Sequence, residues 1–278
     1  GGCYALSELT LPFLGAHLDA TEEARLSYLS VEPEALKSVT VIKGKNIYEN
    51  AFSGYTALTS IHLPEEVESI GYAAFLGCTS LVGITLPENV VELGSFAFFE
   101  CSALTSIHIP KGITVIESST FQDCIALTEV VIPESVTVLE SGAFYKCTAL
   151  ESIVIPDSVT HIGVSAFGNC LSLSQVKLSA NLQYMGQQAF GWCPLLTDIT
   201  IPKSLGEYAI GDTAAPFEYS GLKNITFEEG TTRIPGCLFE NCAHIAKAEI
   251  PETVTEIGGR AFMGCTSLES VNLPLGLE

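Results

Sequence analysis

The sequence predicts a repeat solenoid, in which short parallel strands stack along one axis and bury a continuous core. Three observations predict this fold. Eight of the ten cysteines follow a 23-residue step that is interrupted once, a phenylalanine stands three residues before each of these eight, and a leucine (once an isoleucine) opens each unit at a constant register. Self-similarity at a fixed period of about 20–50 residues is the signature of stacked repeat units, none of which can bury its apolar side alone.

The cysteines and phenylalanines define two ladders that we predict to be buried. The uninterrupted part of the ladders comprises Phe75, Phe98, Phe121, Phe144, Phe167 and Phe190, with Cys78, Cys101, Cys124, Cys147, Cys170 and Cys193. Phe239 with Cys242 and Phe262 with Cys265 continue the pattern.

The unit from Leu127 to Ala149 predicts the local structure of every repeat. Its L-x-x-I-x-I segment alternates apolar and polar residues, as a short strand with one buried face does. Pro133 removes a backbone donor and ends that strand. A second short strand is expected over Val136–Leu139, and the segment around Phe144 and Cys147 is expected to form a tight return, either one helical turn or one 3₁₀ turn.

The leucine register predicts about twelve 23-residue units, with the first and last incomplete, a parallel β-sheet on the concave face and few helical turns. We expect residues 1–278 to form one solenoid that is a fragment of a longer array. Two irregular insertions interrupt the period, at residues 13–35 and at residues 206–216. The segment Thr21–Leu26 in the first insertion is typical of a capped helical turn or two.

Composition excludes several classes of protein. The net charge is −20 with 12 lysines and arginines, so the chain lacks the basic surface that binds nucleic acid or anionic lipid. The two uncharged stretches, Ser158–Val176 and Leu178–Thr197, carry too many polar side chains to span a bilayer. We therefore expect no nucleic-acid partner and no membrane insertion.

The repeat resembles the BspA-type, or treponemal-class, leucine-rich repeats. The resemblance rests on L-x-x-I-x-I-P, on V-x-x-I-G at Val67–Gly71, Val159–Gly163 and Val254–Gly258, and on A-F-x-x-C, and it covers nearly the whole chain. It implies a surface or secreted protein, typically of a host-associated bacterium and in some cases of a parasitic protist, that acts in adhesion or protein binding through the concave sheet. It implies no catalytic residues.

Outward positions of the first strand are the candidate binding residues. In L-x-x-I-x-I the residue between the two isoleucines points away from the core. Val131 and Val154 form an apolar centre between His108 and Lys177, although β-branched residues also favour strands without any binding role. The candidate residues on this face are His62, Thr85, His108, Val131, Val154, Lys177, Thr200 and Glu129.

Metal binding and disulfides are the weaker interpretations of the remaining pattern. A zinc site needs closely paired ligands, and the ladder cysteines are 23 residues apart. Free cysteine is a small apolar side chain, so a buried ladder of thiols is favoured over bridges. The carboxylates after the prolines, such as Glu65 and Glu88, could bind Ca²⁺, but solubility is the better explanation. We expect no cofactor and no metal.

The sequence thus predicts a non-enzymatic, monomeric, secreted or cell-surface module that binds a protein on a host or neighbouring cell. Two alternatives stay open. One is a ligand-free structural spacer of a larger surface protein. The other is a carbohydrate-binding module, for which Tyr184 and Trp192 are the candidate aromatic residues.

Overall fold

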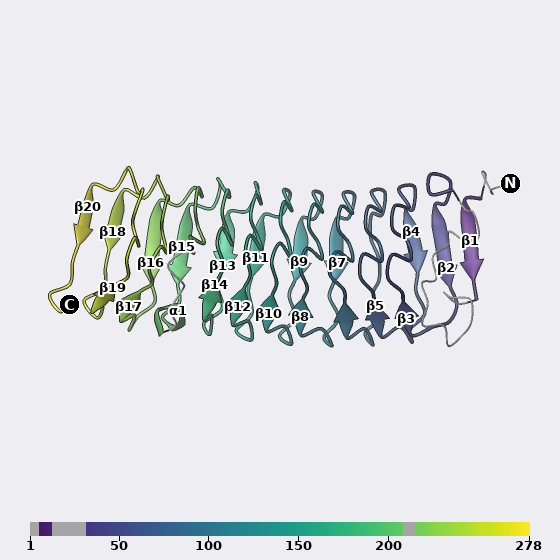
Figure 1. Cartoon of the computed structure of the whole chain (residues 1–278), viewed down its shortest axis with the longest axis horizontal. Coiled ribbons are helices and arrows are strands. Elements are labelled where there is room, and N and C mark those ends of the chain that lie inside the picture. The colour runs from purple at the N-terminus through teal and green to yellow at the C-terminus, as the bar shows by residue number, and fades with distance from the viewer. Residues whose placement is uncertain (1–5, 13–31, 208–214) are drawn as a thin grey trace.

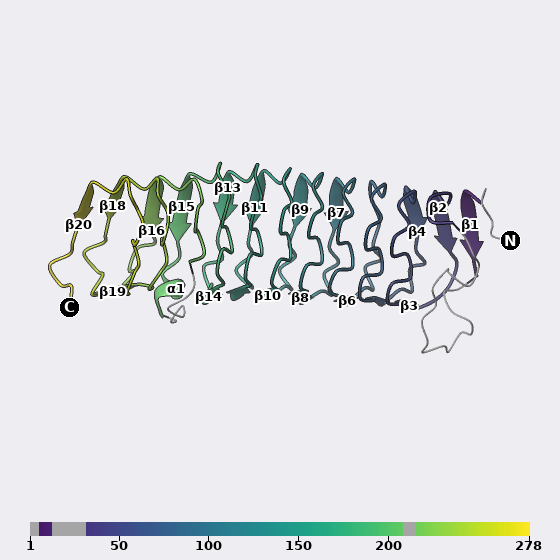
Figure 2. The ribbon, with the colours of Figure 1, turned by 45° about the horizontal axis from the view of Figure 1, so that its top comes forward.

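The chain folds into an elongated stack of about ten turns, described here from a computed structural model. The structure describes residues 6–12, 32–207 and 215–278. Figure 1 shows two rows of strands that run the length of the molecule, with β1 and β20 at opposite ends. Figure 2 shows the same two rows on different sides of the stack. The prediction of a parallel β-solenoid with few helical turns is confirmed.

Each row contains one strand from successive units. The first row consists of β1 (Glu8–Leu11), β2 (Ser38–Val41), β4 (Ser60–His62), β7 (Ser106–His108), β9 (Glu129–Val131), β11 (Ser152–Val154), β13 (Gln175–Lys177), β15 (Asp198–Ile201), β16 (Asn224–Phe227), β18 (Lys247–Glu249) and β20 (Ser270–Asn272). The second row consists of β3 (Asn46–Ile47), β5 (Ser69–Ile70), β6 (Glu92–Leu93), β8 (Val115–Ile116), β10 (Val138–Leu139), β12 (His161–Ile162), β14 (Tyr184–Met185), β17 (Arg233–Ile234) and β19 (Glu256–Ile257).

Strand register follows the repeat. Val138 pairs with His161 and Ser152 pairs with Gln175, each in parallel and one period apart. The register also survives the longer units, because Asp198 pairs with Asn224 across 26 residues. The extra residues of this unit therefore do not shift the strand register. A shift by one residue would turn the apolar side chains of the strand outward.

Two units depart from the predicted pattern within the described residues. In the unit that opens at Leu81, residues 82–86 form no strand, and glycine at position 83 offers no side chain to pack on a pleated surface. In the unit that opens at Leu196, the four-residue helix α1 (Ser204–Glu207) replaces the second strand. The structure does not describe residues 13–31 and 208–214. Most of the two predicted insertions, and all of Thr21–Leu26, therefore lie outside the described residues.

The return segments use left-handed backbone conformations in place of the expected helical or 3₁₀ turn. In the unit of Phe75, Ala73 has φ 51° and Gly77 has φ 71°, and the same two positions are left-handed in most units. For a residue other than glycine, this left-handed conformation costs about 1–2 kcal/mol of free energy relative to the right-handed one. In the return segments, left-handed residues alternate with right-handed ones, and this alternation interrupts a continuous helix.

The left-handed residues orient backbone N–H groups of the return segment toward carbonyl groups of the next turn. In one return segment the amides of Gly142, Phe144 and Lys146 donate to carbonyls of the following unit at 2.9, 2.7 and 2.9 Å. Each such bond satisfies a backbone amide that a helix would have paired internally. The return segments are thus a third line of hydrogen bonds between turns, beside the two rows of strands.

The phenylalanine rings form one continuous stack in the core. Consecutive rings from Phe52 to Phe190 lie 5.2–5.6 Å apart between centroids, with interplanar angles of 4–14°. The stack continues through Phe217 and Phe239 to Phe262, with centroid distances of 5.7, 6.1 and 5.4 Å. Side chains of one kind therefore meet their own copies in the next turn.

The ladder cysteines are buried free thiols that donate hydrogen bonds to the preceding turn. The Sγ of Cys147 lies 3.2 Å from the carbonyl oxygen of Phe121, and each of the other seven ladder thiols makes the equivalent contact. Burial raises the pKa of Cys78 and of Cys193 to about 12. Charge is disfavoured in an apolar core, so these thiols stay protonated.

Truncation of a central ring tests the stack. Phe144 packs between Phe121 and Phe167, so Phe144→Ala should lower the free energy of unfolding by about 3–5 kcal/mol through lost burial and a cavity. Urea titration followed by circular dichroism measures the loss. Phe262→Ala is the matched control, because that ring is only half-buried and has one neighbour in the stack. A loss below about 1 kcal/mol for Phe144→Ala would contradict the proposed packing.

The buried thiols predict a loss of stability at alkaline pH. An unfolded thiol has a pKa near 8.5, whereas burial raises the folded-state value well above that for Cys147. The thiol contribution is therefore complete below about pH 8.5 and declines as the pH rises, because only the unfolded chain releases its protons. Removing one thiol with Cys147→Ala should reduce the pH slope of the unfolding free energy by about 1.4 kcal/mol per pH unit. Identical slopes for variant and parent between pH 9 and 11 would refute the assignment.

Candidate functional site

The exposed side of the first row of strands forms a surface that we call the strand face. Its three-residue strands alternate exposed, buried and exposed residues, as in β9 and β11. The buried central residue packs on the core and leaves the residues on either side facing outward. Consecutive units therefore present two parallel columns of side chains at fixed spacing.

The two valines of the predicted apolar centre and the residues that flank them lie on four consecutive strands of this face. His108 on β7 pairs with Val131 on β9, and Val154 on β11 pairs with Lys177 on β13. The valines are 65% and 59% exposed, which is high for an apolar side chain in a core-forming repeat. The Nε2 of His108 lies 3.0 Å from Oε1 of Glu88, so its imidazole is held beside the carboxylate that follows the proline of the previous unit.

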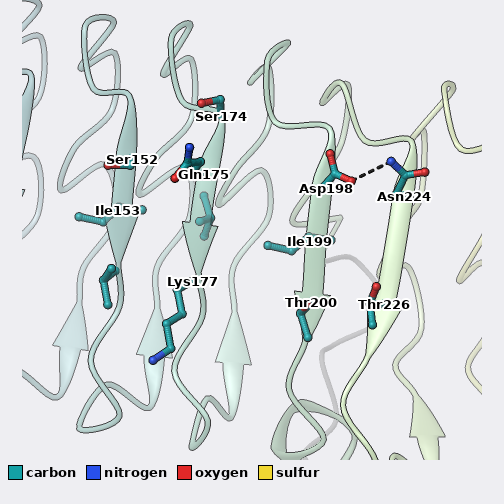
Figure 3. Close-up of a pocket in the computed structure, with 12 residues that line it drawn as sticks. Ser152, Ile153, Ser174, Gln175, Lys177, Asp198, Ile199, Thr200, Asn224 and Thr226 are labelled. Atoms are coloured by element: carbon teal, nitrogen blue, oxygen red, sulfur yellow. Dashed lines mark hydrogen bonds between the residues drawn. The ribbon is translucent and has the colours of Figure 1, made fainter.

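A groove of about 460 Å³ opens beside this centre, between β11, β13, β15 and β16 (Figure 3). β13 and β15 belong to different hydrogen-bonded sheets, and the groove lies across that boundary. Its apolar lining comes from Ile153, Val154, Val176 and Ile199. Polar groups line the remainder: Ser152, Ser174, Gln175, Lys177, Asp198, Thr200, Asn224 and Thr226.

Opposite charges occupy the two ends of the groove. Figure 3 shows Lys177 at the end of β13 and Asp198 at the start of β15. Thr197 Oγ1 donates to Asp198 Oδ2 at 2.5 Å, and Asn224 Nδ2 donates to Oδ1 at 2.7 Å. These hydrogen bonds, first from Thr197 and then from Asn224, lower the pKa of Asp198. The carboxylate is therefore ionised and held in one orientation.

The predicted residues divide into two groups. Val154, Lys177 and Thr200 line the groove. His62, Thr85, His108, Val131 and Glu129 are exposed on earlier turns and do not line it. Thr85 also falls in the unit without a strand, so its predicted place on a strand is wrong.

Sequence reasoning missed Asn224 as a groove residue. It pairs with Asp198 one unit later, but the unit between them has 26 residues, so a 23-residue step from Asp198 does not reach it. Continuing the column from Leu196 to Leu222, the leucines that open those two units, would have found it. Tyr184, the second aromatic candidate for a sugar site, lies near His161, with ring centroids 6.0 Å apart, whereas Trp192 packs on Tyr219.

The described residues contain no group of three or more histidines, cysteines, aspartates or glutamates placed to hold a metal ion. None of the helices in the described part of the chain has the length and apolar character needed to cross a membrane.

Comparisons with known proteins agree with the repeat architecture. Residues 45–170, 114–215 and 208–278 match the BspA type leucine rich repeat region, in six copies. No curated protein gave a significant match to the sequence.

Two solved structures share the fold over most of their length. A leucine rich cell surface protein from Faecalibacterium prausnitzii A2-165 is 27% identical, with 98% of this chain and 83% of that chain aligned at a TM-score of 0.57. A leucine-rich repeat protein from Bacteroides ovatus ATCC 8483 is 25% identical, with 98% and 82% aligned at a TM-score of 0.65. The repeat, the solenoid and the family match together show that this chain belongs to the BspA type leucine-rich repeat family.

Proposed function

We propose that this chain is a cell-surface or secreted module that binds a protein partner through the strand face. The exposed pair Val131 and Val154, in register between His108 and Lys177 and next to the groove, is the observation that carries the proposal. An apolar centre with a polar rim is the composition of a protein interface. The similarity to a cell surface protein of F. prausnitzii supports the location.

Charge indicates what kind of partner fits. The chain carries a net charge of −20, so a basic partner surface would be attracted over long range and at a raised association rate. Lys177 and Asp198 would then fix the register of the bound segment, with an acidic group near the lysine and a basic group near the aspartate. The function needs no catalytic residue and no cofactor. The protein would act as a monomer towards a partner on a host or neighbouring cell.

Charge introduction at the apolar centre tests the proposal. The double variant Val131→Glu with Val154→Glu should abolish binding to a panel of immobilised extracellular-matrix proteins, because charged side chains would replace the apolar centre and lose their hydration against the apolar part of the partner surface. Surface plasmon resonance measures binding, and circular dichroism checks that the fold is intact. Val91→Glu is the matched control, because Val91 is 59% exposed but precedes the second-row strand β6.

Three outcomes separate the alternatives. Binding by the parent and by Val91→Glu, but not by the double variant, supports the strand face. Binding that survives in all three proteins refutes it. Failure of the parent to bind any member of the panel favours the ligand-free spacer.

A further inference from the structure

An exposed aromatic pair lies on the return segments, away from the strand face. Trp192 and Tyr219 occupy the same position in neighbouring units, two residues after the stacked phenylalanine. Both have left-handed backbones, with φ 58° and 59°. Each side chain is 48% exposed, and the ring centroids lie 4.6 Å apart. The stack itself does not require large rings here, because this position holds glycine, aspartate or lysine in other units.

A fixed carboxylate adjoins the aromatic pair. Gln188 Nε2 donates to Glu218 Oε2 at 2.9 Å, and Asn241 Nδ2 donates to Oε1 at 2.8 Å. Side chains from the preceding and the following unit thus hold this carboxylate, one at each oxygen. The negative charge of Glu218, the preceding residue in the chain, raises the pKa of the Tyr219 hydroxyl. Each carboxylate oxygen has a further lone pair for a ligand hydroxyl.

We propose that Trp192, Tyr219 and Glu218 form a binding site for a neutral pyranose ring of a glycan. The apolar C–H face of the sugar would pack on the aromatic surface, and its hydroxyls would donate to the Glu218 carboxylate. Ligand sites generally combine apolar and aromatic surface with a few fixed polar groups. Acidic sugars fit badly, because Glu218 and the net charge of −20 repel anions.

The chain supplies its own control for exposed aromatic surface. Tyr72 is 47% exposed and packs on Phe96 at 5.6 Å between ring centroids. The neighbouring ring at that site is Phe99, 5.6 Å from Phe96, so the cluster is extended by apolar rather than polar contacts. Tyr72→Ala therefore removes a similar exposed ring without touching the proposed site.

The single tryptophan of the sequence makes the test direct. Trp192 is that residue, so intrinsic tryptophan fluorescence reports on this site alone. We expect a saturable fluorescence change with at least one of cellotriose, mannotriose and chitotriose, and none with a heparin oligosaccharide. Calorimetric titration should show binding at least about tenfold weaker for Tyr219→Ala and for Glu218→Ala, each of which removes one contact of the bound state. Trp192→Ala, measured by calorimetry, should bind least.

Specificity controls make the result decisive. Tyr72→Ala and the strand-face double variant should bind the sugar as the parent does, which separates this site from the proposed protein-binding function. The proposal is overturned if none of the three oligosaccharides binds more tightly than about 10 mM. It is also overturned if heparin binds better, or if Glu218→Ala and Tyr219→Ala bind as tightly as Tyr72→Ala.

Discussion

The contact between phenylalanine rings of successive turns is the interaction on which the rest of this structure depends. A single 23-residue unit has two short strands and a return segment, which is too little to enclose an apolar core. Stacking supplies the missing side of each unit, and ring-to-ring spacings near 5 Å match the spacing of hydrogen-bonded strands. The same geometry brings each thiol within reach of a carbonyl in the preceding turn. The same spacing between turns therefore suits the stacked rings, the thiol hydrogen bonds and the pairing of the strands.

A core of this kind leaves the surface free to vary. The strand face is held by residues such as Ile153 and Ile199, which are almost fully buried, while Val154 and Thr200 beside them face outward. The groove lies across the boundary between the sheets of β13 and β15, and its lining is both apolar and charged. Binding residues on such a face are positioned by a rigid sheet rather than by loops, which lowers the entropy lost when a partner binds.

Much of the fold could be predicted because the same pattern of residues recurs in successive units of the sequence. The spacing of Phe144 and Cys147 from their copies predicted the stacked units, and period-two alternation predicted which strand residues face outward. The groove itself was not predicted. Three of its lining residues, Val154, Lys177 and Thr200, were candidates as outward strand positions, whereas Asn224 lies beyond a longer unit. The aromatic pair was half predicted. Trp192 was a candidate, but its neighbour Tyr219 follows it by 27 residues, across the longer unit, so a 23-residue step from Trp192 does not reach it.

The left-handed position two residues after each stacked phenylalanine has a consequence for how such proteins diversify. Its backbone amide is fixed by the next turn, but its side chain points away from the core, and in this chain the position holds glycine, acids, amides, lysine, tryptophan and tyrosine. The conformational cost is smallest for glycine and lower for asparagine and aspartate than for most other side chains, yet this position also accepts lysine, tryptophan and tyrosine. Substitutions there can alter molecular recognition one turn at a time while the hydrogen bonds and the core stay the same. The array is in effect a linear display of independently exchangeable side chains, separated by one strand spacing, on an unchanging frame.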